Sequence, residues 1–363
     1  MDKISELKRI LGQQLGWHKS RLDCFAQMLL SLLAVKTVNL HELAIGMNSQ
    51  TQISSRNKRV YRFFASFTID MTVISRWLFQ LFFSSIPKVY VAIDRTNWYW
   101  GRQMINIFML SVCFEGIAIP ILWTVDNKKG TSSAVEQIAL CERFVKLFGS
   151  ECIEGLLGDR EFANKTFIAW LCESKIPFYL RIKGDTHTHI KKQKFQKVSA
   201  LFSPLKPYEQ QVFGIKVRVL GQSLYLSASK NERGELMIIA TNAKYASAVA
   251  IYLRRWEIES LFQAFKGRGF RFEDTHVTHP ERIEKIIVLL AVGFAWAHKT
   301  GEWQAEKKPI SFKKFKTQRR PQYSFFRYGL DHLRDLLTNL TTRQFPLKRY
   351  LKLLEIPRPE VAT

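Results

Sequence analysis

The sequence has few acidic residues for its number of basic ones. Its 363 residues include 55 lysines and arginines but 31 aspartates and glutamates, so the formal net charge at pH 7 is +24. The basic residues are spread along the chain rather than confined to a tail. This charge exceeds what solubility requires and favours a polyanionic partner, most simply nucleic acid.

Long apolar runs and paired cysteines are also missing. The longest nearly continuous apolar run, IIVLLAVGFAWA at 286–297, falls well short of the roughly 20 residues that a membrane-spanning helix needs. We therefore expect a buried core helix there and no membrane partner.

The five cysteines follow irregular spacings without a C-x-x-C pair, which argues against a zinc site or a disulfide framework and predicts reduced thiols. The first residues lack the apolar core and cleavage site of a secretory signal, which predicts a cytoplasmic location.

The pattern of apolar residues changes along the chain and divides it into segments. Helical periodicity with basic clusters comes first, and continuous or alternating apolar runs then predict strands and intervening helices. The predicted segments are a helical N-terminal DNA-binding module (1–85), the first part of a core (86–183), a β-rich insertion (184–236), the second part of the core with a catalytic helix (237–300) and a basic, helical C-terminal segment (301–363).

The order of the core elements predicts the fold class. Three consecutive strands at 88–94, 104–114 and 117–125 are joined by short turns. A helix, a strand at 153–159, a second helix and a strand at 177–183 follow. This is the order of the ribonuclease H-like fold, an α/β layer architecture with a mixed sheet. We therefore expect an α/β protein with a ribonuclease H-like core.

Three carboxylates stand where such a core would bring them together. Asp94 closes the first predicted strand, Asp159 closes the strand at 153–159, and Glu259 lies on a predicted helix at 252–270. Side chains at strand C-termini gather at one rim of an open sheet, and a helix across that rim would add Glu259. Close carboxylates repel unless a cation neutralises them, and Mg²⁺ prefers oxygen ligands. Taken singly, either aspartate also fits a turn or a helix cap.

The predicted helix YLRRWEIESLFQAFKGRGF carries one unusual stripe. Its members are Tyr252, Arg255, Glu259 and Lys266. A regular helix places these side chains within about 60° of arc along roughly 21 Å. The stripe combines a carboxylate with groups that bind phosphate, although an arginine four residues before a glutamate is also a common surface pair.

These motifs resemble the insertion sequence 4 family of DDE transposases, which are bacterial insertion-sequence enzymes. The family signature is Tyr, two residues, Arg, three residues, Glu, six residues and Lys, and residues 252–266 match every spacing. The surroundings of the two aspartates, VAIDRTNW and GDREFANKTFIAWL, are similar to that family, as are IIATN and FFRYGLDHL. The resemblance runs from about residue 15 to 340.

The resemblance implies a catalytic metal site and a set of DNA contacts. Asp94, Asp159 and Glu259 would hold two Mg²⁺ ions, with Mn²⁺ as an alternative. Tyr252, Arg255 and Lys266 would contact phosphates near the transposon 5′ end. The implied enzyme binds double-stranded DNA at terminal inverted repeats, cuts there and joins the 3′-hydroxyl groups to target DNA. A homodimer in the synaptic complex and a place at the bacterial nucleoid follow from the same resemblance.

Other basic and aromatic residues are further candidates for DNA contact. Arg160 and Arg181 lie beside and beyond the second aspartate. The N-terminal segment contributes a basic cluster, which consists of Arg56, Lys58, Arg59 and Arg62. An amphipathic helix that packs internally is the alternative for this cluster, and both can hold on opposite faces. The family also uses an aromatic residue of its β insertion to hold a flipped base, for which this insertion offers Phe202, Tyr208, Phe213 and Tyr225.

Two functions of other kinds compete with transposition. One is a domesticated, non-catalytic DNA-binding protein on a transposase scaffold. The three carboxylates argue against it, because DNA binding alone does not require carboxylates that face phosphate. The other is a metal-dependent DNA nuclease that cleaves without strand transfer. The Tyr-Arg-Glu-Lys signature favours transposition over both, and cleavage and strand-transfer assays distinguish the three.

Overall fold

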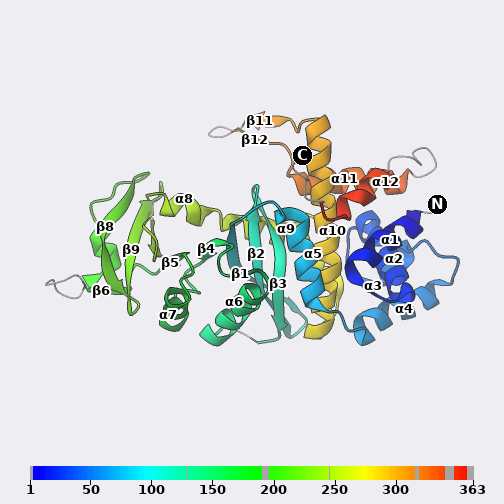
Figure 1. The fold of residues 1–363 in the computed structure, drawn as a ribbon, viewed down its shortest axis with the longest axis horizontal. Helices are drawn as coiled ribbons and strands as arrows, with labels where there is room; N and C mark the ends of the chain where they lie inside the picture. Colours follow the sequence, from blue (N-terminus) through cyan, green and yellow to red (C-terminus); the bar gives the residue numbers. More distant parts are fainter. Residues whose placement is uncertain are drawn as a thin grey trace, which may run out of the picture.

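One mixed sheet of ten strands runs through the computed structural model, with helices along its length and the N-terminal helices beyond one end (Figure 1). The structure describes residues 3–128, 130–189, 196–244, 246–314, 319–339 and 347–357. The first half of the sheet is formed by β1 (Val89–Trp100), β2 (Gln103–Phe114), β3 (Ile117–Asp126), β4 (Ile153–Gly158) and β5 (Phe178–Ile182).

The pairing of these strands confirms the predicted ribonuclease H-like fold. The strands β1, β2 and β3 form an antiparallel meander, β4 lies parallel to β1, and β5 lies parallel to β4. The resulting order is β3-β2-β1-β4-β5. The helices α6 (Ala134–Phe148) and α7 (Lys165–Glu173) form the connections that parallel strands require. The β2–β3 turn has positive φ at Glu115 and Gly116, which suits a tight hairpin.

The predicted β insertion continues the same sheet instead of forming a separate layer. Strand β10 (Leu236–Thr241) pairs with β5 on one side and with β9 (Gln222–Lys230) on the other. The sheet then extends through β8 (Gln210–Val219), β6 (His187–His189) and β7 (Gln196–Lys197). A short 3₁₀ helix, η1 (Val198–Phe202), follows β7. This end of the sheet lies farthest from the N-terminal helices (Figure 1).

The N-terminal segment is helical, as predicted. It consists of α1 (Lys3–Leu15), α2 (Lys19–Val35), α3 (Leu40–Gly46), α4 (Ile53–Ser66) and α5 (Met71–Phe83). Helix α4 is amphipathic, because it buries Val60, Phe63 and Phe64 and exposes Lys58 and Arg62. Asn39 and Asp70 cap α3 and α5 through their side-chain oxygens. The internal packing proposed for this segment is therefore present on one face of α4.

A long central helix, α10 (Pro280–Lys307), joins the sheet to the helical part. Residues 286–297 are all buried, which confirms the predicted core helix. Helix α10 packs against α2, against β3 and against α11 (Phe325–Thr338). In the described ranges no single helix is long and apolar enough to span a membrane, although the bent pair of α2 and α3 meets that test by length and composition. The five cysteines are free thiols.

The remaining elements precede and follow this helix in the chain. Before it lie α8 (Ala248–Leu253), α9 (Trp256–Phe265) and the 3₁₀ helix η2 (Phe272–Thr275). Beyond α10, the chain forms the small two-stranded sheet of β11 (Phe312–Lys314) and β12 (Arg319–Pro321), followed after α11 by α12 (Leu347–Leu351) and η3 (Lys352–Leu354). Helices α5, α6, α9 and α10 pack against β3, so the continuous apolar pattern of β3 reflects its burial.

Candidate active site

Two aspartates lie side by side because of how β1 and β4 pair. The parallel register ends with the pair Ile93 and Gly158, and Asp94 and Asp159 are the next residues of the two strands. A Cβ atom at position 158 would lie 2.9 Å from Leu180 Cδ2 and 3.3 Å from Ile93 Cγ1. Glycine therefore permits the close packing at this point, and both carboxylates stand at one rim of the sheet.

The prediction that Asp94 ends its strand is wrong. Strand β1 continues to Trp100, because the polar stretch after Asp94 pairs with β2 down to Trp100 and Gln103. The apolar pattern ends at Asp94 only because the pairing with β4 ends at Ile93. Asp94 thus keeps its place opposite Asp159 although it lies within a strand. Asp159 directly follows β4, as predicted.

The predicted single helix over 252–270 is also wrong. Helix α8 ends at Leu253 and α9 begins at Trp256. Between them, the backbone N–H groups of Arg254 and Arg255 donate to carbonyls three residues earlier, as in a 3₁₀ turn. Lys266 ends α9 with a non-helical backbone. The four signature residues therefore do not form one straight stripe, since tertiary contacts override the local helical preference.

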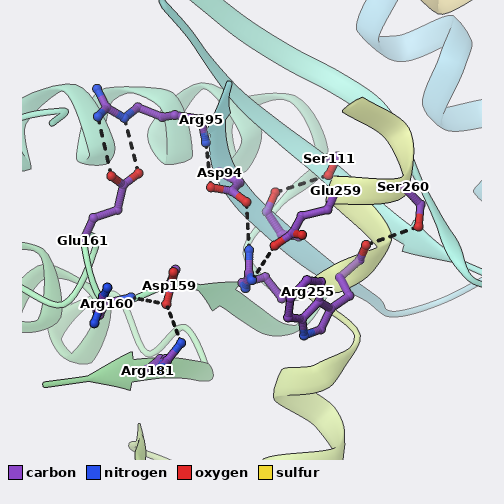
Figure 2. Close-up of polar contacts among 12 residues, drawn as sticks. Asp94, Arg95, Ser111, Asp159, Arg160, Glu161, Arg181, Arg255, Glu259 and Ser260 are labelled. Atoms are coloured by element: carbon purple, nitrogen blue, oxygen red, sulfur yellow. Dashed lines mark hydrogen bonds and ion pairs between the residues drawn. The ribbon is translucent and has the colours of Figure 1, made fainter. Parts of the chain in front are cut away.

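Arg255 joins Glu259 to Asp94. Its Nη1 donates to Asp94 Oδ2 over 2.8 Å, and its Nη2 donates to Glu259 Oε1 over 2.7 Å (Figure 2). The residue is 4 % exposed. Its Nε is buried and has no hydrogen-bond partner. The guanidinium therefore lies between two carboxylates from β1 and α9 and neutralises their repulsion.

Tyr252 and Arg181 hold the second aspartate. The Tyr252 hydroxyl donates to Asp159 Oδ1 over 3.3 Å, and Arg181 Nη1 lies 3.8 Å from the same oxygen. Tyr252 is 1 % exposed, and this burial raises the pKa of its hydroxyl, so the group stays protonated and remains a donor. All three carboxylates are thus linked to signature residues or to β5.

The Asp94 carboxyl has an unusual proton affinity. Burial raises the pKa of Asp94 to about 6, against the opposing effects of Arg255 and of the Arg95 backbone N–H. A carboxyl with such a pKa is mostly ionised at neutral pH and exchanges its proton for a cation readily.

The donor set suits a divalent cation. Carboxylate oxygens are the ligands that Mg²⁺ prefers, and Asp94, Asp159 and Glu259 supply them. Among the described residues no group of three or more His, Cys, Asp or Glu side chains is arranged to hold a metal ion. The Arg255 guanidinium lies between Asp94 and Glu259. The carboxylates would be free to hold a divalent cation only if this guanidinium moved aside.

Lys266 lies farther along the same surface. Its Nζ donates to the carbonyl of Asn97 over 3.2 Å and lies 2.9 Å from Glu273 Oε1. It also lies 5.4 Å from the centre of the Trp98 ring. Its observed contacts are therefore with the β1 backbone and the segment after α9.

The surface has two hollows lined by basic residues, one beside Asp159 and the other between the N-terminal helices. Arg160 and Arg181 line a hollow of about 280 Å³ beside Asp159. Lys58, Arg59 and Arg62 line one of about 590 Å³ between α2 and α4. Five of the six basic residues predicted for DNA contact outside the signature thus line one of these two separate hollows. Arg56 is the sixth, and it donates to the carbonyls of Ile45 and Met47.

One charged pair beside the aspartates was missed by sequence reasoning. Arg95 follows Asp94, and Glu161 lies two residues after Asp159. Their side chains form an ion pair with Nε and Oε1 3.3 Å apart (Figure 2). Opposite charges next to the two aspartates were the available signal.

Among the aromatic candidates of the insertion, Tyr208 is 78 % exposed and Phe202 is 1 % exposed.

Among the comparisons with known proteins, a family model identifies the family of the chain. A family model described as "Transposase DDE domain" matches residues 91–293, a stretch that contains all three carboxylates. No curated protein matches the chain. A cryo-electron microscopy structure of the piggyBac transposase synaptic complex with hairpin DNA is similar at 14 % identity and a TM-score of 0.47, over 99 % of this chain and 84 % of that chain.

Proposed function

The chain belongs to the transposase DDE domain family and is thereby a DNA transposase, and from this premise we propose that it is an insertion-sequence enzyme of the insertion sequence 4 type. It binds terminal inverted repeats, cleaves the transposon ends and joins the free 3′-hydroxyl groups to target DNA. The observation that carries the proposal is that Asp94 and Asp159 directly follow the last paired residues of β1 and β4, and that the buried Arg255 joins Asp94 to Glu259. A purely DNA-binding protein has no need of this arrangement.

Asp94, Asp159 and Glu259 are the proposed ligands of a divalent cation, Mg²⁺ or alternatively Mn²⁺. A pair of such ions supplies charge neutralisation at the scissile phosphodiester and an activated oxygen nucleophile. Released from Asp94 and Glu259, the Arg255 guanidinium would be free to bind a DNA phosphate. Tyr252 orients Asp159 through its hydroxyl, and Lys266 adds a donor along the DNA strand.

The two basic hollows are the proposed binding sites for the DNA backbone. Arg160 and Arg181 contact a phosphate beside the active site. The N-terminal module (1–85) binds the inverted repeat through α4, and the core segments (86–183 and 237–300) perform the cleavage. The insertion (184–236) and the C-terminal segment (301–363) extend the basic surface. A homodimer brings two transposon ends together in the synaptic complex, at the bacterial nucleoid.

Cleavage of the element's own terminus tests this function. The full chain is incubated with a labelled terminal duplex with and without Mg²⁺, and the products are resolved on a denaturing gel. Nicking at the terminus that needs the metal, followed by joining to a target plasmid, is the expected result. Cleavage without joining would identify a nuclease, and binding without cleavage would identify a non-catalytic DNA-binding protein.

The pH dependence of cleavage should reflect the Asp94 carboxyl. Its carboxylate form prevails above the pKa of about 6 and is lost as the pH falls through that value. A proton and a metal compete for the same oxygens, so the metal concentration for half-maximal cleavage should rise on the order of tenfold for each pH unit below 6 and stay constant above about 7. Metal titrations of cleavage from pH 5 to 8 measure this. A constant requirement down to pH 5 would contradict it.

The basic residues of α4 should divide into two groups. Lys58 and Arg62 are exposed beside the hollow, whereas Arg56 binds two carbonyls and Arg59 contacts Asp23. The double substitution Lys58→Ala and Arg62→Ala should weaken terminal DNA binding and lower the slope of log affinity against log salt by about 2. Arg56→Ala should mainly lower the unfolding temperature. Fluorescence anisotropy at several salt concentrations and thermal melts distinguish the groups, and equal salt slopes in wild type and double variant would place the DNA elsewhere.

A further inference from the structure

The backbones of β1 and β4 are no longer paired at Asp94 and Asp159. The β1–β4 register ends at Ile93 and Gly158. Past this pair β1 continues along β2, while the chain after β4 enters a turn in which the Phe162 N–H donates to the Asp159 carbonyl. The two backbones therefore diverge at the point where their carboxylates have to keep a constant separation.

The Arg95–Glu161 ion pair spans this divergence. Arg95 Nε lies 3.3 Å from Glu161 Oε1 and Nη2 lies 3.5 Å from Oε2, a two-pronged contact that fixes orientation as well as distance. The side chains are 10 % and 27 % exposed. Phe162, the next residue, stacks on Phe108 of β2 with ring centres 5.6 Å apart and so anchors the turn to the meander. The pair thus ties the turn to β1 within two residues of each aspartate.

The aspartate side chains are in turn fixed to the backbone that the pair holds. Asp94 Oδ1 accepts from the Arg95 N–H over 2.8 Å, and Asp159 Oδ1 accepts from the Arg160 N–H over 2.7 Å. Arg95 is mostly buried and engaged with Glu161, so it is not placed to bind a DNA phosphate.

We propose that Arg95 and Glu161 are positioning residues that set the separation of Asp94 and Asp159 and thereby the affinity of the site for divalent cations. The proposal rests on the proposed function, because it takes the two aspartates as metal ligands. Groups that orient ligands in this way typically change metal affinity by about 10- to 100-fold when they are removed.

Metal binding to the DNA-free protein tests the proposal independently of turnover. Titration calorimetry with Mn²⁺ is carried out on wild type, Arg95→Gln, Glu161→Gln and the exchanged pair Arg95→Glu with Glu161→Arg. Each single substitution should raise the Mn²⁺ dissociation constant about tenfold or more, while terminal DNA binding without metal stays within about twofold. The exchanged pair should recover most of the loss. Arg95→Lys, which keeps the charge but not the two-pronged contact, should fall between.

The chain offers a matched control at the opposite end of the same two strands. Lys88 and Glu154 form an ion pair 3.8 Å apart where β1 and β4 begin. Glu154→Gln should leave the Mn²⁺ affinity unchanged. Thermal melts identify any variant that fails to fold, in which case Arg95→Lys carries the test.

The outcomes distinguish the pair from the site itself. Unchanged Mn²⁺ affinity in folded Arg95→Gln and Glu161→Gln, together with weakened affinity in Asp94→Asn, would overturn the positioning role and leave the metal site intact. A loss in Arg95→Gln without one in Glu161→Gln would show that Arg95 acts alone and would also overturn it. If Asp94→Asn binds Mn²⁺ as wild type does, or if wild type binds none, the proposed metal site fails and the role of the pair fails with it.

Discussion

Glu259→Gln is expected to lower cleavage of a terminal DNA duplex on the order of a thousandfold and to leave binding of that duplex nearly unchanged. A carboxylate that holds a catalytic cation contributes several kcal/mol to charge stabilisation in the transition state, and each 1.36 kcal/mol corresponds to about tenfold in rate. The amide keeps the size of the side chain and an oxygen that accepts from Arg255 Nη2, which now lies 2.7 Å from Glu259 Oε1. The fold should therefore persist.

The neighbouring carboxylate on α9 provides the control. Glu257 lies two residues earlier, and its Oε1 is 3.2 Å from Arg254 Nε instead of facing Asp94. Burial raises the pKa of Glu257, and glutamine keeps the size of the side chain and an oxygen that can accept from Arg254. Cleavage by Glu257→Gln should stay within about threefold of wild type. Gel shift and product analysis of both variants decide the matter, and equal cleavage by Glu259→Gln and wild type would remove Glu259 from the active site.

Arg255→Gln is expected to destabilise the metal-free protein and to abolish cleavage. The substitution removes the cation between Asp94, whose side chain is 16 % exposed, and Glu259, whose side chain is 38 % exposed. Loss of one partner from a buried ion pair costs about 3–5 kcal/mol, which for a chain of 363 residues corresponds to a fall of about 4–7 °C in unfolding temperature. Cleavage falls as well, because the guanidinium is the proposed phosphate contact.

The response to metal gives this variant its distinctive signature. At the proposed metal site of wild type, a divalent cation would have to displace Arg255 from Asp94 and Glu259, whereas Arg255→Gln removes this guanidinium. Mg²⁺ should therefore raise the unfolding temperature of the variant more than that of wild type. Thermal melts across a Mg²⁺ series measure the difference. A smaller shift in the variant than in wild type would show that Arg255 helps to bind the metal instead of replacing it.

Arg254→Gln is the control for this substitution. Its side chain pairs with Glu257 and lies 4.8 Å from the Tyr90 ring, and it is 37 % exposed. A pair this accessible to water contributes about 0–1 kcal/mol. The variant should therefore melt close to wild type, cleave DNA and show the wild-type response to Mg²⁺. A large loss of activity in Arg254→Gln would contradict the assignment of the phosphate contact to Arg255 alone.

The sequence by itself determined the order and type of the core elements. Apolar periodicity and β-branched runs are local properties, and they located the strands near Tyr90, Leu110, Ile119, Leu156 and Leu180 within a few residues. The alternation of three strands with helix, strand, helix and strand left one mixed-sheet topology to expect. The same reading selected Asp94, Asp159 and Glu259 as candidates, because carboxylates at the rim of a sheet are informative even before their distances are known.

Only the tertiary structure decided how these groups meet. Local pattern carries no information on pairing between distant strands, so it could not show that β1 continues past Asp94 along β2. Helical periodicity could not reveal the 3₁₀ turn at Arg255, because contacts with Asp94 and Glu259 hold that residue. The Arg95–Glu161 pair joins positions 66 residues apart. Interactions of this kind arise from packing between separate elements, and no spacing within one element specifies them.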